Sequence, residues 1–488
     1  MIEENPEILD KYQLVVGLEV HAQLRTESKA YSGDANQYGS LPNSNTAPLT
    51  LGHPGTLPRL NKKQVEYAIK LGLATSCQIA RQMHFARKNY FYADLPKGYQ
   101  ITQDKTPICE KGHIDVKDAE GNNKRIGITR IHMEEDAGKS IHDQDPFNTL
   151  VDLNRAGVPL LEIVSEPDIR SSEEAYNYLA EVRRLVRYLD ICDGNMEEGS
   201  MRCDANVSVM LKGSEKFGNR CEVKNMNSLR NVQRAIEFEM RRQIKILEGG
   251  GEIQQQTRSF DAVDGITFTL RGKEDAHDYR YFPEPDMQPV ALFEEEIASI
   301  KNEMPPLPKE LYEKYTKELQ LNDYDATIII DSKPIALYYE SIIAHTKNYK
   351  AAANWLMGEI KSYVNQNAIH IENFPVKPEN IAALISLIDE DLVSNSIAAE
   401  QLFPKMIADP ERNPRDLAES ENLLQKSDDT WLRNLAQQAL DKYPEKVDAY
   451  KNGNKGLLGL FMGEVMKLSE RKANPKMASQ LIKELLEE

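Results

Sequence analysis

Glutamate, histidine, arginine and lysine side chains alternate with apolar ones in four segments of this sequence. Alternation with a period of two is typical of a β-strand that has one buried and one polar face. The polar sets are Glu19, His21 and Gln23; Arg130, His132 and Glu134; Arg202, Asp204 and Asn206; and Arg220, Glu222 and Lys224. The second set shares its face with Ile126 and Ile128. A half-solvated sheet would give the same pattern, so one such strand indicates no function by itself.

Four such strands together favour a site for a metal ion and phosphate. Carboxylates and imidazoles that meet from different strands repel one another or need cations. A hard divalent ion such as Mg²⁺ takes oxygen ligands and leaves room for phosphate oxygens. Lys and Arg on the same surface can hold the remaining phosphate charge. The acidic runs at 133–136 and 196–199 adjoin these strands, although a charge run is often only a solvated turn.

Several familiar nucleotide and nucleophile motifs are absent from the sequence. It has no G-x-x-x-x-G-K-[ST] phosphate loop, no Gly-rich dinucleotide fingerprint and no G-x-S-x-G elbow. An ATP site would therefore be of an unusual kind. Residues 85–100 interleave aromatic side chains with Arg87, Lys88 and Lys97. That mixture suits base stacking and phosphate binding, and equally a buried strand with a basic rim.

Length and composition describe an ordinary globular chain. Its 488 residues are enough for about two to four domains, and 40% of them are hydrophobic. The five cysteines are scattered, which suits a reducing compartment. No apolar segment is long enough for a membrane span and no signal peptide is evident, so we expect a cytoplasmic protein. The net charge of −17 argues mildly against a general nucleic-acid binder but leaves room for a local basic patch.

Strands and helices alternate up to about residue 304, and helical patterns follow. Ser171 and Glu174 form a capping box, and a second helix begins near Ser228 and ends at the glycines 249–251. The Pro-rich stretch 304–308 and the Asx-Pro pairs near 410 mark boundaries. We therefore expect an α+β protein. Its predicted parts are a mixed, largely antiparallel sheet cradle with helices over 1–303, a helical domain over 304–409 and a helical tail over 410–488.

Long motifs run through nearly the whole chain in a fixed order. They begin with Val-Gly-Leu-Glu-Val-His at 16–21 and continue at 54–58, 86–100, 132–139, 152–167, 196–208, 222–228 and 278–286. In these motifs the chain closely resembles the B subunits of the bacterial aspartyl/glutamyl-tRNA(Asn/Gln) amidotransferases. Chance similarity of this extent is negligible.

The resemblance implies a ligase that forms C–N bonds with glutamine as the nitrogen donor. Mg-ATP phosphorylates the side-chain carboxylate of Glu-tRNA(Gln) or Asp-tRNA(Asn), and ammonia then displaces phosphate to give the amide. Phosphorylation is needed because a carboxylate is a poor electrophile. Positioning and charge neutralisation carry most of such a transfer.

The resemblance also implies roles for particular residues. Metal ligands are expected at Glu19, His21, Glu134 and Glu222. Glu134, Glu135, Arg202 and Lys224 are the expected catalytic residues. ATP or the aminoacyl end is expected at Asn154, Arg155, Asp204 and Asn206, and Lys88 and Lys97 resemble residues near the passage for ammonia.

The resemblance implies the partners as well, and they fit what the chain lacks. It has no Ser-Ser-Lys amidase signature and no glutaminase cysteine, so a separate amidase, the family's A subunit, must supply ammonia. A small third protein, the C subunit, braces the resulting heterotrimer. Charged tRNA(Gln) or tRNA(Asn) is the substrate. The tail is implied to contact tRNA, with phosphate contacts expected from Lys451, Lys455, Lys467, Arg471, Lys472 and Lys476.

Some members of the family carry four cysteines that resemble a zinc site. Here the corresponding positions hold Ser32, Asp34, Ala47 and Thr50, so no structural zinc is expected. The E subunit of the archaeal-type Glu-tRNA amidotransferase is the main alternative, but it carries an inserted domain for which this chain has no room. A non-catalytic tRNA-binding scaffold is the other, and it would have lost the acidic and histidine positions that are present here.

Overall fold

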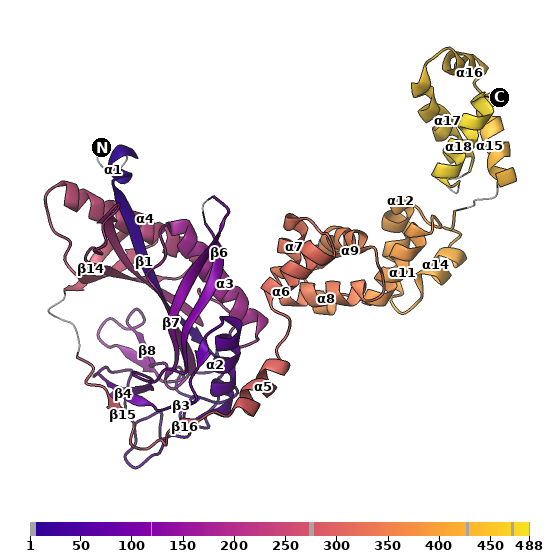
Figure 1. Cartoon of the computed structure of the whole chain (residues 1–488). Helices are drawn as coiled ribbons and strands as arrows, with labels where there is room; N and C mark the ends of the chain where they lie inside the picture. The colour runs from indigo at the N-terminus through magenta and orange to yellow at the C-terminus, as the bar shows by residue number, and fades with distance from the viewer. Residues whose placement is uncertain (1–5, 119, 273–277, 426–428, 470–472, 488) are drawn as a thin grey trace. The chain divides into compact units, whose positions relative to one another are not determined.

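The structure is a computed structural model that describes residues 6–118, 120–272, 278–425, 429–469 and 473–487 (Figure 1). It separates into two compact units, Met1–Pro308 (unit 1) and Lys309–Glu488 (unit 2). Unit 1 combines a large sheet with helices and unit 2 is helical, which confirms the α+β class. The finer division into domains 1–303, 304–409 and 410–488 stays a prediction.

A nine-stranded sheet organises unit 1, in the order β14-β13-β12-β11-β1-β10-β7-β6-β2. All neighbouring strands run antiparallel except β12 and β13, which are parallel. The strands are β1 (Tyr12–Gln23), β2 (Gln78–Ile79), β6 (Cys109–Lys117), β7 (Asn123–Glu135), β10 (Pro159–Ser165), β11 (Met201–Leu211), β12 (Cys221–Met226), β13 (Gln256–Asp261) and β14 (Ile266–Gly272).

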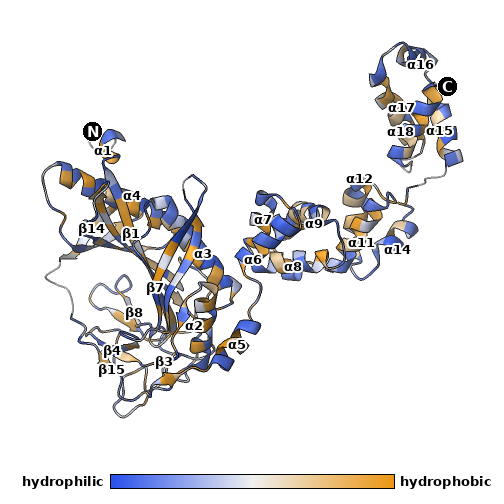
Figure 2. Ribbon diagram, viewed as in Figure 1, coloured by the Kyte–Doolittle hydropathy of each residue, from blue (hydrophilic) through white to orange (hydrophobic). Residues whose placement is uncertain are grey.

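Helices cover the apolar face of this sheet. α2 (Lys62–Ala74) packs on β7, α3 (Ser172–Tyr188) on β6 and β1, and α4 (Leu229–Glu248) on β11, β12 and β14. Ser171 caps α3 by accepting from the Glu174 amide, and Ser228 caps α4. α4 ends at the predicted glycines. The hydrophobic sides of these helices turn toward the sheet (Figure 2), so the opposite, polar face is left for other contacts.

A β-bulge changes the alternation within β7. Val164 pairs with Arg130 and the next residue, Ser165, pairs with Ile128, so Thr129 is the extra residue. An inserted residue reverses which side chains face the core. Ile126 and Ile128 are therefore buried in the same core as Ile131 and Met133. The expectation that they share the face of His132 and Glu134 was wrong for this reason.

Three small sheets and two further helices complete unit 1. The sheets are β15-β4-β5, β16-β3 and β8-β9. Their strands are β3 (Gln82–Met83), β4 (Ala86–Asn89), β5 (Tyr99–Thr102), β8 (Lys139–Ile141), β9 (Leu150–Asp152), β15 (Phe282–Pro283) and β16 (Val290–Ala291), and the helices are α1 (Pro6–Leu9) and α5 (Glu294–Asn302). β5 contacts β7, which brings the basic segment around Lys88 close to the large sheet.

A buried charge holds the outer edge of the large sheet to α4. The Glu239 carboxylate is fully buried and accepts hydrogen bonds from Arg242 (2.6 and 2.9 Å), Gln243 (2.9 Å) and Thr267 of β14 (3.0 Å). Arg258 of β13 lies 3.3 Å away. Burial opposes the charged form, but the hydrogen bonds from Arg242 and Gln243 outweigh burial and lower the pKa of Glu239.

We expect Glu239→Gln to lower the free energy of unfolding of the sheet unit by about 3 kcal/mol at pH 7, because it leaves the buried Arg258 and the half-buried Arg242 without their carboxylate. The charge of Glu239 stabilises the folded protein fully at pH values above the pKa of an unfolded glutamate, about 4.3. This stabilisation is lost as the pH falls through the lower pKa that Glu239 has in the folded protein. Chemical denaturation at a series of pH values should therefore show that the difference in free energy of unfolding between wild type and Glu239→Gln becomes smaller in acid. Glu237→Gln on the same helix is the control, and equal stabilities of the two variants at pH 7 would contradict this account.

Unit 2 is built from helices. Among the described residues, its α-helices are α6 (Pro308–Glu313, which begins at the last residue of unit 1), α7 (Asp323–Ile330), α8 (Lys333–Ile343), α9 (Tyr349–Trp355), α10 (Lys361–Gln366), α11 (Pro378–Asp389), α12 (Asn395–Ile397), α13 (Phe403–Ala408), α14 (Pro414–Ser420), α15 (Asp429–Asp441), α16 (Pro444–Lys451), α17 (Leu458–Leu468) and α18 (Pro475–Glu487). Short π-helical segments (Lys314–Glu318, Leu356–Ile360 and Ala398–Leu402) and 3₁₀ segments (Ile371–Asn373 and Lys455–Leu457) lie between them. Leu432, Phe461 and Ile482 belong to one core formed by α15, α17 and α18.

Of the tail residues expected to contact tRNA, Arg471 and Lys472 lie outside the described residues. No helix among the described residues is long and apolar enough to span a membrane.

Candidate active site

One row of side chains crosses four adjacent strands on the polar face of the large sheet. The backbone register places Arg202 of β11 opposite His21 of β1, His21 opposite Glu162 of β10, and Glu162 opposite His132 of β7. Directly opposed residues on one face have side chains within contact distance. The row therefore sets one carboxylate between two imidazoles.

Glu162 is the centre of this row. Its Oε2 lies 3.1 Å from His21 Nε2 and 3.5 Å from His132 Nε2, and its Oε1 lies 3.7 Å from Arg130. The residue is 5% exposed. Burial raises the pKa of Glu162, but the charge of His132 and the hydrogen bond with His21 outweigh burial and hold the pKa well below its usual range. The carboxylate is therefore ionised at neutral pH.

Glu19 and Glu134 lie on either side of the row. Glu19 is 3.8 Å from His21, and Glu134 is 3.8 Å from His132. Burial and the nearby charge of Glu162 raise the pKa of Glu19. At Glu134 burial has the same tendency, but the charge of Lys88 outweighs it and lowers the pKa. The two carboxylates thus differ in how readily they give up a proton.

The geometry brings together two overlapping sets of potential metal ligands. Glu19, His21 and Glu162 form one set, and His132, Glu134 and Glu162 form the other, each with ligand atoms within 4.8 Å of one another. The Nδ1 atom of His132 is buried and has no hydrogen-bond partner among the described residues. Carboxylate oxygens with imidazole nitrogens suit a divalent cation, and oxygen-rich sets suit Mg²⁺.

Basic side chains surround these carboxylates. Lys88 of β4 reaches Glu134 (3.4 Å), and the charges of Glu134 and Glu162 outweigh burial and raise its pKa. On the other side of the row, Lys224 of β12 pairs with Asp204 and lies 2.9 Å from Glu222. Here too the neighbouring carboxylates outweigh burial and raise the pKa of the lysine. The site thus carries fixed positive charge on both flanks.

Arg202 is held by a residue just beyond the end of β7. Its Nη2 donates to the buried Asp136 carboxylate at 2.7 Å, and Gln23 of β1 donates to the same oxygen, also at 2.7 Å. Burial raises the pKa of Asp136, but the charge of Arg202 outweighs it, and the pKa is lowered. Asp136 therefore fixes the orientation of one arginine that lines the row.

Several residues predicted for the site make other contacts. Glu222 lies beside Lys224 and Thr257 (2.9 Å), and the metal-ligand sets found among the described residues do not include it. Glu135 pairs with Lys97 and accepts from the Ile101 amide (2.9 Å). The roles proposed for these residues stay predictions.

Asn154 and Arg155 also contact the chain itself. Asn154 accepts from the Asn45 amide (2.8 Å) and donates to Leu41 O (2.7 Å), which ties down a loop. Arg155 donates to the carbonyls of Ala137 (3.0 Å) and Gly138 (2.5 Å). Neither residue belongs to the central row, and their expected role toward ATP or the aminoacyl end stays a prediction.

Glu162 and Asp136 were missing from the predicted site. Glu162 stands alone in the apolar run 159–164, which predicts a strand buried on both faces. A single carboxylate in such a run is the signal that identifies it, because an unpaired charge is rarely buried. Asp136 follows the last strand residue, so alternation does not assign it to a face.

The four positions compared with zinc cysteines converge on Asp34. Its carboxylate accepts from Ser32, from Thr50 (2.7 Å) and from the Ala47 amide (3.2 Å), and it pairs with Lys29 (2.9 Å). The Lys29 side chain is fully buried and also donates to the carbonyls of Asn45 (2.7 Å) and Leu153 (3.3 Å). The ammonium group of Lys29 thus lies where a bound cation would crosslink the loop. The carboxylate, hydroxyl and carbonyl groups around it do not fit zinc.

We expect the purified protein to contain no stoichiometric zinc, and chelators to leave its stability unchanged. Asp34→Ala should lower the free energy of unfolding by about 3 kcal/mol, because Lys29 would keep a buried charge without its partner. Elemental analysis and chemical denaturation measure the two effects. Asp104→Ala, on an exposed turn, is the control; one zinc per chain would contradict the assignment.

The fold and the site define the class of the protein. Residues 14–298 match the family described as the GatB/GatE catalytic domain, and residues 337–486 match the GatB domain. Unit 1 is therefore a catalytic domain of the GatB/GatE class.

Relatives named as the B subunit of aspartyl/glutamyl-tRNA(Asn/Gln) amidotransferase match almost end to end. The protein from Caldicellulosiruptor bescii is 47% identical over 480 residues, which is 98% of this chain and 99% of the relative. The protein from Persephonella marina is 47% identical (98% and 100% covered), and that from Trichlorobacter lovleyi is 49% identical (98% and 99%). The chain belongs to this family of B subunits, which confirms the resemblance seen in its sequence.

Proposed function

We propose that this chain is the activating subunit of a glutamine-dependent tRNA amidotransferase. A side-chain carboxylate oxygen of Glu-tRNA(Gln) or Asp-tRNA(Asn) attacks the γ-phosphorus of ATP, and ADP leaves. Ammonia then attacks the acyl carbon, phosphate leaves, and a proton is lost as the amide forms. The enzyme is a ligase of the C–N class, and we expect it to act in the cytoplasm, where tRNA is charged.

The row centred on Glu162 supports this function most directly. The triphosphate oxygens and the substrate carboxylate are all negative, so a phosphoryl transfer needs positive charge that is already in place. Glu162, His21, Glu134 and Glu19 would hold a divalent cation, which when bound neutralises phosphate oxygens. Lys88 and Lys224 hold permanent charge on the two flanks.

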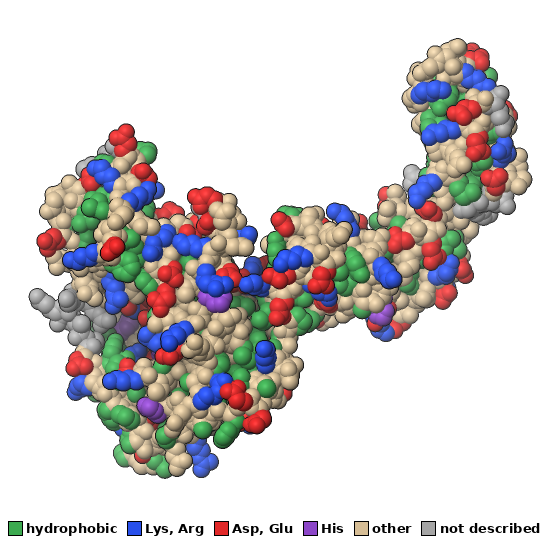
Figure 3. Space-filling view, viewed as in Figure 1, with side chains coloured by type: hydrophobic (Ala, Val, Ile, Leu, Met, Phe, Trp, Pro, Cys, Tyr) green, Lys and Arg blue, Asp and Glu red, His purple; other side chains and the backbone are tan. Residues whose placement is uncertain are grey.

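Three partners complete the proposed reaction. The amidase (the A subunit) supplies ammonia, the small C subunit joins the heterotrimer, and the charged tRNA brings the carboxylate. Lys and Arg alternate with Asp and Glu on the face shown in Figure 3, with no uniformly basic surface. On this face, contacts to tRNA phosphates would come from small groups of basic residues.

A reconstituted amidation assay tests the proposal. The chain is purified with its amidase and its small partner and given Mg²⁺, ATP, glutamine and either Glu-tRNA(Gln) or Asp-tRNA(Asn). We expect ATP-dependent formation of Gln-tRNA or Asn-tRNA, with ADP and phosphate released in equal amounts. A scaffold that only docks the amidase would bind tRNA without hydrolysing ATP, and amidation of neither tRNA would refute the activating role.

A further inference from the structure

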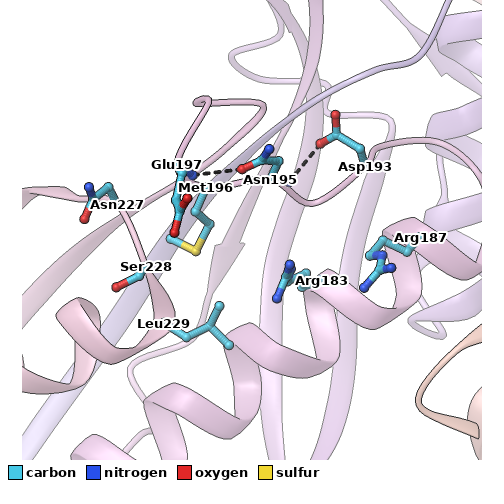
Figure 4. A pocket seen from close by; sticks show the side chains of 9 residues that line it. All are labelled: Arg183, Arg187, Asp193, Asn195, Met196, Glu197, Asn227, Ser228 and Leu229. Atoms are coloured by element: carbon cyan, nitrogen blue, oxygen red, sulfur yellow. Dashed lines mark hydrogen bonds between the residues drawn. The ribbon is translucent and has the colours of Figure 1, made fainter. Parts of the chain in front are cut away.

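A cavity of about 460 Å³ opens in unit 1 beside α3, and none of its lining residues belongs to the central row. Arg183 and Arg187 of α3 form one wall, the loop before β11 forms another, and residues 227–229 after β12 form the third (Figure 4). This volume falls within the range of small-ligand sites. The mechanism proposed above uses none of these side chains.

Two arginines give the cavity its positive side. Arg183 donates from Nε to Gly194 O at 2.8 Å, which anchors the loop and leaves the rest of its guanidinium group toward the cavity. Arg187 is exposed, and its guanidinium makes no ion pair or hydrogen bond with a described residue. In Figure 4 both side chains extend from the same side of α3. Neighbouring guanidinium groups are suited to bind phosphate oxygens.

The remaining wall is of a different chemical kind. Glu197 presents an exposed carboxylate, while Met196 and Leu229 supply apolar surface. Asp193 and Asn195 are already engaged, because they accept from the amides of Asn195 (2.8 Å) and Glu197 (3.0 Å) within the loop. A carboxylate next to apolar surface suits a ligand that has hydroxyl donors beside a flat or apolar face.

We propose that this cavity is a nucleotide subsite, in which Arg183 and Arg187 bind the phosphate and Glu197 accepts a ribose hydroxyl. A nucleotide is a ligand class that combines the three groups that the walls suit: an anionic phosphate, a ribose hydroxyl and a base. The inference rests on the proposed function, which offers two sources of such a nucleotide, the tRNA and ATP.

The cavity is joined by the chain to the active face. The loop 193–200 leads directly into β11, on which Arg202 is the first polar-face residue. Residues 227–229 follow β12, which carries Lys224. A nucleotide that binds here would therefore stabilise the two chain segments that enter and leave the basic flank of the site.

Arg187→Ala in the reconstituted heterotrimer tests the subsite. Because the side chain is exposed, the fold should be kept, and loss of one charged hydrogen bond should raise KM roughly fivefold while kcat is kept. A higher KM for aminoacyl-tRNA identifies the tRNA as the source of the nucleotide. In that case, the slope of log K against log salt for tRNA binding should be smaller by about 0.7–0.9 in the variant. A higher KM for ATP alone identifies ATP as the ligand of the cavity.

Two further variants make the test specific. Arg241→Ala removes an equally exposed charge from α4 outside the cavity, and it should leave both KM values unchanged. Equal changes in KM for Arg187→Ala and Arg241→Ala, or no change in either variant, would overturn the subsite. The proposed function would still stand as long as the wild-type protein amidates the charged tRNA. Glu197→Gln should raise, by about two- to fivefold, the KM of the same substrate that Arg187→Ala affects. A lowered KM would mean that the carboxylate only repels the ligand, and Glu197 would then not bind the ribose.

Discussion

Glu162→Gln is expected to lower kcat for ATP-dependent amidation by at least about 10³-fold. The amide keeps the shape of the side chain but removes the charge that His21 (3.1 Å) and His132 (3.5 Å) share. Both potential ligand sets contain this carboxylate, so a divalent cation would lose its common ligand. The loss should be seen equally in the ADP released and in the amide formed.

The control for this substitution is Glu166→Gln, on the exposed turn that follows β10. It removes the same charge four residues later, outside the strand, and we expect unchanged activity. Binding of the charged tRNA, measured by filter retention, should persist in both variants. If Glu162→Gln kept more than about a tenth of the activity, a difference of under 1.4 kcal/mol in the barrier, the central role of Glu162 would be wrong.

Lys88→Met is expected to lower amidation by about 100-fold, because it removes the cation next to Glu134 while keeping the length of the side chain. The ammonium group lies 3.4 Å from Glu134 and faces the Tyr279 ring at 5.3 Å. It is the positive charge contributed by the small β15-β4-β5 sheet to the flank of the row.

The nitrogen donor separates two roles of Lys88. If the lysine acts on carboxylate activation, the variant should lose the same factor with glutamine as with ammonium chloride. Loss with glutamine alone would instead place Lys88 only in the passage for ammonia. Lys111→Met, an exposed lysine on β6, is the control for loss of a charge from unit 1.

Local alternation was enough to predict three strands of the large sheet, β1, β11 and β12, and their polar faces. The predicted polar sets fall within β1 and β11, and the third begins one residue before β12, because an apolar-polar alternation is a property of each segment alone. The bulge at Thr129 could not be predicted in this way, since an extra residue in β7 makes sense only against its partner β10. The wrong placement of Ile126 and Ile128 follows from that one residue.

The composition of the site depends on which strands are neighbours. Glu19 and His21 were identified from β1 alone, but the carboxylate that joins them comes from β10, about 140 residues later. The order β11-β1-β10-β7 is set by long-range pairing, which no local pattern contains. Glu222 was grouped with Glu134 on the family resemblance. In the sheet, β11, β1 and β10 separate their strands, and the role of Glu222 stays a prediction.

The central position of β1 has a consequence for synthesis of the protein. β1 is made before its partners, because β10 and β11 come roughly 140 to 200 residues later in the chain. Until then its apolar face, from Leu14 to Ala22, has no sheet to join. Sheets closed by such distant pairing form slowly and leave nascent strands prone to aggregation. Newly made chains should therefore depend on chaperones until residue 211 has emerged, and a fragment that ends before Arg202 lacks one member of the row around Glu162.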